Sequence, residues 1–196
     1  MRKVTVTNNV TLDGVMQSPG GREEDTRNNF EHGGWAAPYN DEVKGREMAK
    51  GMSQRADLLF GRRTYEHFFK VFPGRTDNPF SELLDNTPKY VASRTLREPL
   101  PWQNSILLSG DAADSVARLK AQPGPDLVIL GSGELVQSLV RRNLVDIFVL
   151  LIHPLVLGSG HRMFADDDTF SKLTLVDSVT TTTGVIIATY HAATSE

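Results

Sequence analysis

Twice along this chain, a short apolar run is followed at once by a glycine and a segment with helical spacing. The first is Leu58-Leu59-Phe60 followed by Gly61-Arg62-Arg63-Thr64-Tyr65-Glu66. The second is Leu127-Val128-Ile129-Leu130 followed by Gly131-Ser132-Gly133-Glu134-Leu135. Each pattern predicts a buried strand, a glycine turn and the start of a helix. A chain built from such units favours a mostly parallel sheet covered by helices, because parallel strands need crossover connections.

Both glycine turns are also candidate phosphate sites. A helix N-terminus carries unpaired backbone N–H groups and a partial positive charge, which together suit an anion. Glycine allows close approach of the backbone to a ligand, Arg62 offers a planar charged fork, and Thr64 adds a hydroxyl. Two such sites predict a nucleotide held at two points. An ordinary strand-to-helix turn with a solvent-facing arginine explains the first turn equally well.

The remaining segments continue the alternation of strands and helices. With the two strands already described, strands are expected at residues 4–10, 57–60, 89–92, 105–108, 127–130 and 145–152. A final antiparallel pair is expected at 173–180 and 184–191. Helices are expected at 41–54, 62–72 and 80–84, after Asp111, and around Leu135 to Val140. Residues 12–39 form a long irregular loop of the kind that often carries function. These elements predict an α/β fold with a mostly parallel central sheet of about eight strands, an antiparallel C-terminal edge and helices on both faces.

Composition narrows the class of protein. At 196 residues the chain fits one domain, expected to span 1–196. A net charge of −3 gives no basic field for nucleic acid. The absence of cysteine excludes disulfides and fits a reducing cytoplasm, and no apolar run approaches the roughly 20 residues that span a bilayer. We therefore expect a cytoplasmic protein with a small-molecule ligand and no metal, since the histidines lack paired metal spacing.

Polar residues also follow the strand at 89–92. Ser93-Arg94-Thr95 places a guanidinium between two hydroxyls, and an arginine beside the ribose accommodates the 2′-phosphate that distinguishes NADP from NAD. A polar loop before Pro99 is the simpler explanation of this segment alone. The turn from Gly131 to Gly133 fails the strict dinucleotide fingerprint, because Val136 stands where a third small residue is needed.

These segments, taken in order, resemble the dihydrofolate reductase superfamily. The branch they resemble most is the reductase (C-terminal) domain of the bifunctional riboflavin-biosynthesis deaminase/reductase and its stand-alone bacterial relatives. The matching segments are Leu12-Asp13-Gly14-Val15-Met16, Phe60 to Glu66, Ala92 to Leu96, Leu130 to Leu135, Leu144-Val145-Asp146, and Pro154 to Gly160 with Phe164. They span nearly the whole chain.

The resemblance implies a three-layer dihydrofolate-reductase-like fold that binds NADPH across the carboxyl ends of the strands. The implied cofactor-binding residues are Gly61, Arg62, Arg63, Thr64, Ser93, Arg94, Gly131, Ser132, Gly133, Glu134 and Leu135. Among these, Arg62, Ser93 and Arg94 would hold the 2′-phosphate, and Thr64 with the turn from Gly131 would hold the pyrophosphate. Relatives also imply a homodimer, with the apolar stretch 148–156 as a candidate interface.

The proton donor is less clearly indicated. Asp13, beside the expected nicotinamide, could relay a proton, or it could be a turn residue that bonds its own backbone. A folate reductase carries an acid in its first helix, but counting back from Gly61 places that position near Gly45, and Asp41 reads more simply as a helix cap. Trp35 and His153 are expected to be buried anchors rather than ligand contacts.

The resemblance thus implies an NADPH-dependent reductase acting on a small heterocycle or a ribosylaminopyrimidine, as in riboflavin biosynthesis. A dihydrofolate or pterin reductase is the first alternative. A nucleotide-binding module without turnover is the second, since no acid is fixed at the catalytic position.

Overall fold

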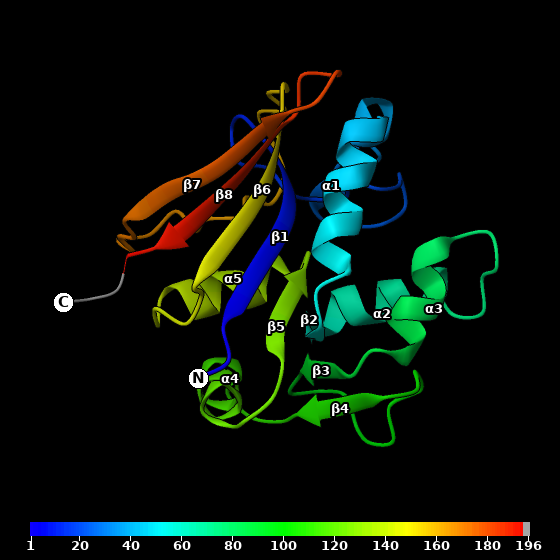
Figure 1. The fold of residues 1–196 in the computed structure, drawn as a ribbon, viewed down its shortest axis with the longest axis vertical. Helices are drawn as coiled ribbons and strands as arrows, with labels where there is room; N and C mark the ends of the chain where they lie inside the picture. The colour runs from blue at the N-terminus through cyan, green and yellow to red at the C-terminus, as the bar shows by residue number, and fades with distance from the viewer. Residues whose placement is uncertain (194–196) are drawn as a thin grey trace.

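The computed structural model describes residues 1–193, and its centre is one eight-stranded sheet (Figure 1). The strands are β1 (Val4–Thr11), β2 (Ala56–Gly61), β3 (Lys89–Ala92), β4 (Ser105–Leu108), β5 (Asp126–Leu130), β6 (Ile147–His153), β7 (Leu173–Thr180) and β8 (Ile186–Ala192). Their order across the sheet is β4-β3-β2-β5-β1-β6-β8-β7. Only β8 runs antiparallel to its neighbours, so the predicted parallel sheet with an antiparallel C-terminal edge is confirmed.

Five α-helices cover the two faces of this sheet. They are α1 (Glu42–Met52), α2 (Arg62–Val71), α3 (Pro79–Asn86), α4 (Ala112–Ala121) and α5 (Gly133–Val140). Helices α4 and α5 bury the main core against Val4, Val6 and Val10 of β1. Helices α1, α2 and α3 lie on the opposite face, where alternate residues of β2 and β6 point.

The amino-acid composition of β6 reflects its position in the sheet. Strand β6 lies between β1 and β8 and is almost continuously apolar, as a strand covered on both faces requires. Both edges of residues 148–152 are paired with β1 and β8, so the predicted dimer interface over 148–156 would use a face of the sheet there and not a strand edge.

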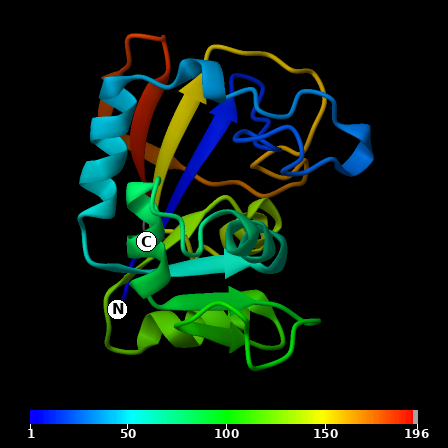
Figure 2. The ribbon, with the colours of Figure 1, turned by 90° about the vertical axis from the view of Figure 1, so that its right-hand side faces the viewer.

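The sheet is strongly twisted, and two long loops meet at one end of it. In Figure 2 the strands β1 and β6 run steeply, while β2, β3 and β4 lie across them. The loop after β1 and the segment after β6 are joined by a bridge between Val15 and Arg162 and by the bond from Met16 N to the His161 carbonyl (2.9 Å). The expected irregular region 12–39 is thus held at the carboxyl ends of β1 and β6.

Helix cover is incomplete over the middle of the sheet. On the face of α4 and α5, β1 is buried at Val4, Val6, Asn8 and Val10. On the face of α1, its residues Thr5, Thr7 and Asn9 remain half-exposed although β1 is flanked by strands on both sides. The α1 side of the central strand therefore keeps three polar residues partly open to solvent.

Candidate cofactor and substrate site

The two glycine turns predicted to bind phosphate meet in the folded chain. The backbone N–H of Gly61 donates to Ser132 Oγ, and the N–H of Ser132 donates to Thr64 Oγ1, both at 3.0 Å. Strands β2 and β5 are parallel neighbours, with Leu58 opposite Val128, so their carboxyl ends emerge side by side. Helices α2 and α5 then start next to one another, as the idea of two converging phosphate sites requires.

Glycine is required at this junction because the two turns are tightly packed. Gly131 has a φ of +68°, and a Cβ there would lie 3.2 Å from Thr64 Cγ2. A Cβ on Gly133 would lie 2.8 Å from Met16 Sδ. Met16 thus reaches the start of α5 from the long loop, which places that loop against the same junction.

The residues predicted to hold a 2′-phosphate lie beside this junction. Gly61 of β2 and Ala92 of β3 are paired in the sheet. The next residues of the chain, Arg62 and Ser93, therefore leave the sheet at neighbouring positions. Ser93 and Arg94 line an open depression of about 460 Å³. The remaining lining residues are Leu96, Arg97, Glu98, Leu107, Ser109 and Gly110.

Two basic side chains give this depression its character. Arg94 is exposed and forms no ion pair with any residue in 1–193, while Arg97 lies on the same rim. Ser93 Oγ accepts from the N–H groups of Thr95 and Leu96 at 3.1 and 3.0 Å, which shapes the turn and leaves its own proton free to donate. Arg97 and Ser109 were missed by the sequence prediction, although both follow strand ends of the same sheet edge.

Three charged residues at these helix starts already form ion pairs within the protein: Arg62, Arg63 and Glu134. Arg62 pairs with Glu66 at 3.0 Å within α2, and both side chains are more than a third exposed, so this pair is weak. The carboxylate of Glu134 accepts from Arg63 and, at 2.8 Å, from Arg27 of the long loop. Burial opposes ionisation of Glu134, but the bond from Arg27 and the charges of both arginines lower its pKa. Glu134 can therefore offer a phosphate only its backbone N–H.

Hydrogen bonds hold the carboxylate of Asp13 in the turn that follows β1. Its carboxylate accepts from the Thr11 hydroxyl at 2.6 Å and from the backbone N–H groups of Leu157 and Gly158 at 3.2 and 2.8 Å. The bond from Thr11, together with those backbone bonds, lowers the pKa of Asp13 despite some burial. Of the two roles left open by the sequence, this geometry favours the turn anchor, because a carboxylate kept ionised is a poor proton donor.

The first helix begins with an acid that has a structural role. Asp41 is the N-cap of α1, accepting from Lys44 N at 2.8 Å, and it also accepts from the N–H and hydroxyl of Thr182 at 2.7 and 2.6 Å. The bond from the Thr182 hydroxyl, with those from backbone amides, lowers the pKa of Asp41. Asp41 therefore ties α1 to the turn between β7 and β8, and its interpretation as a helix cap is confirmed.

Trp35 and His153 are buried anchors, as predicted. Trp35 is 7% exposed and donates from Nε1 to the Gln17 carbonyl at 2.7 Å. His153 is fully buried, with Nε2 at 3.0 Å from Asn9 Oδ1 and its ring packed edge-on against Trp35 and Tyr39. Burial lowers the pKa of His153 to about 4, and the nearby charge of Lys44 adds to this effect.

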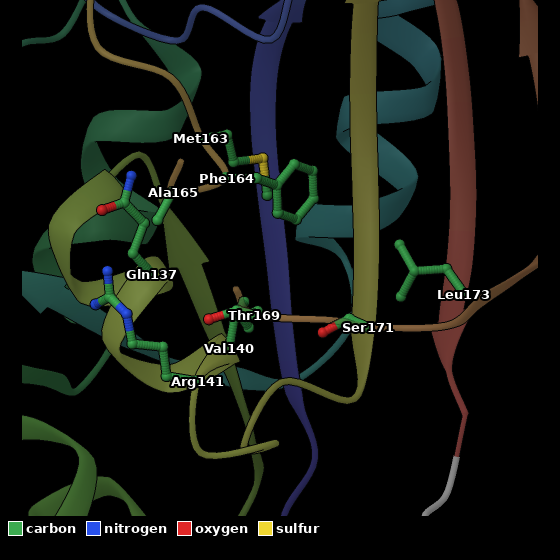
Figure 3. A pocket seen from close by; sticks show the side chains of 9 residues that line it. All are labelled: Gln137, Val140, Arg141, Met163, Phe164, Ala165, Thr169, Ser171 and Leu173. Carbon is green, nitrogen blue, oxygen red and sulfur yellow. The ribbon is translucent and has the colours of Figure 1, made fainter. Parts of the chain in front are cut away.

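A second pocket lies away from all of these residues. It has a volume of about 230 Å³ and lies between α5, the segment 163–171 and the start of β7 (Figure 3). Its wall is largely apolar, with Met163, Phe164 and Leu173 directed toward the opening. None of the predicted cofactor residues lines it.

Comparison with known proteins identifies the family of this chain. A family model described as the RibD C-terminal domain matches residues 2–187. The chain belongs to the RibD C-terminal domain family. Its resemblance to the reductase (C-terminal) domain of the riboflavin-biosynthesis deaminase/reductase is thereby confirmed.

Relatives of this RibD C-terminal domain occur in Bacillus subtilis (strain 168). YyaP is 28% identical over 195 residues, which cover 97% of this chain and 95% of YyaP. YwjB is 32% identical over 120 residues, which cover 60% of this chain and 63% of YwjB.

Three solved structures share the fold. The "Putative riboflavin biosynthesis protein" of Shewanella sp. PV-4 superposes with a TM-score of 0.69 at 21% identity, covering 98% of this chain and 99% of its own. A pyrimidine reductase-like protein from Corynebacterium diphtheriae gives 0.62 at 13% identity, covering 99% and 93%. Dihydrofolate reductase from Enterococcus faecalis, complexed with NADP(H), gives 0.58 at 15% identity, covering 97% and 96%. The RibD C-terminal domain described here therefore has the dihydrofolate-reductase-like fold.

Proposed function

We propose that this chain is an NADPH-dependent oxidoreductase that reduces a small heterocycle or a ribosylaminopyrimidine of the riboflavin-biosynthesis type. The observation that carries this proposal is the junction of Gly61, Thr64 and Ser132 beside the basic depression at Arg94. Family membership and the pyrimidine reductase-like neighbour support the substrate class.

The residues at this junction fit the chemistry of NADPH. Two adjacent helix starts, with glycines where a side chain would intrude, suit a pyrophosphate. The depression at Ser93, Arg94 and Arg97 suits a second phosphate group, and Arg62 lies next to it along the sheet edge. When bound, NADPH supplies the hydride, while the protein binds, orients and shields the reacting groups.

The test of this proposal compares NADPH with NADH. In Arg94→Ala and Arg62→Ala, we expect NADPH affinity to fall roughly 10- to 150-fold, because a charged hydrogen bond contributes about 1.5–3 kcal/mol. NADH affinity should change little. Arg55→Ala is the matched control, since Arg55 is exposed at the opposite end of β2. Equal losses for the two cofactors would refute the 2′-phosphate site.

Turnover separates the proposed enzyme from its alternatives. Oxidation of NADPH should be followed with aminopyrimidines, pterins and simple carbonyl compounds. Activity on pterins alone would favour a dihydrofolate or pterin reductase. Tight NADPH binding without oxidation of any substrate would favour a nucleotide-binding module.

We further propose that the protein acts in the cytoplasm as a homodimer of one 1–196 domain. None of the helices within residues 1–193 is long and apolar enough to cross a bilayer. Exposed apolar residues near this pocket support a second copy as partner. Phe164 lines the pocket of Figure 3 and is 42% exposed. Phe170, between the lining residues Thr169 and Ser171, is 86% exposed, and Leu175 of β7 is 53% exposed. The last three positions of the predicted domain lie outside the described residues.

A further inference from the structure

Three lysines of this chain lie in the protein interior, and one of them lacks a partner. Lys44, Lys89 and Lys120 are 8%, 0% and 6% exposed. Lys89 donates to three backbone carbonyls, and Lys120 donates to the Leu144 carbonyl and pairs with Asp146. Within residues 1–193, the Lys44 ammonium makes no hydrogen bond and no ion pair. Lys44 is thus a largely buried residue whose charged end has no protein partner, and desolvating an unpaired charge is costly, so it needs a physical explanation.

Lys44 lies on the buried side of α1, one helical turn before Met48. Helix α1 packs through Met48 against Leu151, and the charge of Lys44 acts on His153 two residues further along β6. The amine is not sealed in the interior, because it is absent from the fully buried unpaired atoms. Its stem is buried while its tip remains open to a ligand.

Half-exposed residues of β1 and β5 lie on the same side of the sheet as this helix. Thr7 is paired with Leu130 of β5, which directly precedes the Gly131 turn. Asn9, two residues further along β1, is the partner of His153 through its Oδ1. This side of β1 therefore connects the proposed phosphate junction with the part of β6 that lies near α1.

We propose that Lys44 binds the acceptor oxygen or nitrogen of the substrate and donates the proton that its reduction requires. This rests on the proposed function. Reduction of a C=N or C=O bond adds a hydride to carbon, from the nicotinamide cofactor, and a proton to the heteroatom. Lys44 gives up that proton from its ammonium, becomes a neutral amine, and is reprotonated from solvent. The ligand is a heterocyclic compound with a C=N or C=O bond whose carbon accepts the hydride and whose nitrogen or oxygen accepts the proton.

The surroundings of Lys44 suit a proton donor. Burial lowers the pKa of Lys44, and the negative charge of Asp41 partly opposes this. The other titratable groups of this region are His153, which is neutral above a pKa of about 4, and Tyr39, whose ring packs against His153. A lysine whose pKa is lowered releases its proton more readily than an ordinary lysine.

A simpler explanation is a lysine whose stem packs on apolar surface while its head stays in water. Lys44→Met separates the two, because methionine keeps an unbranched stem and removes the charge. Lys44→Arg keeps the charge but donates a proton poorly, since arginine remains protonated. Lys50→Met is the matched control, since Lys50 lies on the same helix with its side chain 63% exposed.

The first measurement is binding of 5,6-diaminouracil, the ring of the proposed substrate class without its sugar, to protein with and without NADPH. We expect Lys44→Met to weaken this binding at least 10-fold, Lys44→Arg and Lys50→Met to change it little, and NADPH affinity to stay unchanged in all three. Equal binding by Lys44→Met and the wild type, or no binding by the wild type, would overturn the role of Lys44. A wild type that does not bind NADPH would instead refute the proposed function. The binding of 5,6-diaminouracil would still show whether Lys44 contacts the ring.

The second measurement is turnover at several pH values. With the best substrate found, Lys44→Met and Lys44→Arg should lower kcat by 100-fold or more, the usual size of a lost proton donor. The wild-type kcat should fall at alkaline pH as Lys44 loses its proton, and this limb should be absent from both variants. An alkaline limb retained in Lys44→Met would contradict the assignment.

Discussion

At the scale of single residues, the burial of His153 makes the free energy of unfolding depend on pH. It is fully buried, its Nε2 bonds to Asn9, and its Nδ1 has no partner within the described residues 1–193. Burial lowers the pKa of the folded state to about 4 from an ordinary value of 6.5. Between these values the unfolded chain binds a proton that the folded chain excludes.

We therefore expect the free energy of unfolding to fall as pH drops from 6.5 to 4, by up to about 3 kcal/mol. Below pH 4 this contribution no longer changes. Denaturant unfolding at a series of pH values measures it. In His153→Gln the slope over this window should flatten, while the exposed control His32→Gln should retain it. An unchanged slope in His153→Gln would show that other groups cause the acid sensitivity.

Asp13 offers a second test at the residue scale. In Asp13→Asn, two backbone N–H groups and the Thr11 hydroxyl lose a charged acceptor. We expect a loss of about 1–3 kcal/mol in the free energy of unfolding and little change in the pH dependence of kcat. If stability were retained while kcat fell 100-fold or more, Asp13 would be the catalytic residue that the sequence allowed.

At the scale of secondary structure, α3 depends on a single buried cation. Lys89 Nζ donates to the carbonyls of Leu84, Asp85 and Thr87 at 2.6, 3.2 and 2.7 Å, and lies 4.6 Å from the Trp102 ring centroid. These are the carbonyls at the end of α3, which have no partner within the helix. Lysine at the start of β3 thus joins a helix end to the sheet.

Lys89→Met should lower the free energy of unfolding by about 2–4 kcal/mol, because the carbonyls of Leu84 and Thr87 lose this donor. The Asp85 carbonyl keeps its bonds from Gln103 and Asn104. Thermal or denaturant unfolding measures this loss. Lys70→Met is the control, since Lys70 is exposed in the last turn of α2. A Lys89→Met protein as stable as the control would mean that water replaces the ammonium without cost.

At the scale of the whole molecule, the apolar surface beside β7 predicts self-association. We expect Phe170→Ser with Leu175→Lys to convert a dimer into a monomer in sedimentation velocity, because a stable interface needs roughly 1,000 Å² or more with an apolar centre. Leu83→Lys, at an apolar position of α3 that is 40% exposed, is the control and should leave the dimer intact. A wild type that sediments as a monomer at all concentrations would refute the homodimer.

The sequence by itself determined the order and type of the elements. Apolar runs such as 127–130 and the capping residues Asp41 and Asp111 act locally, so β5, α1 and α4 could be located from their own residues. Gly131 was also predictable as a turn, because a positive φ is a local property of the backbone.

Only the tertiary structure decided which side chains meet. The bonds that join Gly61, Thr64 and Ser132 link residues about 70 positions apart, and they exist because β2 and β5 are neighbours in the sheet. The same holds for Asp13, whose partners at Leu157 and Gly158 come from beyond β6, and for Lys44, whose missing partner is visible only once α1 is packed on the sheet. Local propensity specifies each strand and helix, whereas strand order and long-range burial specify the chemistry of the site.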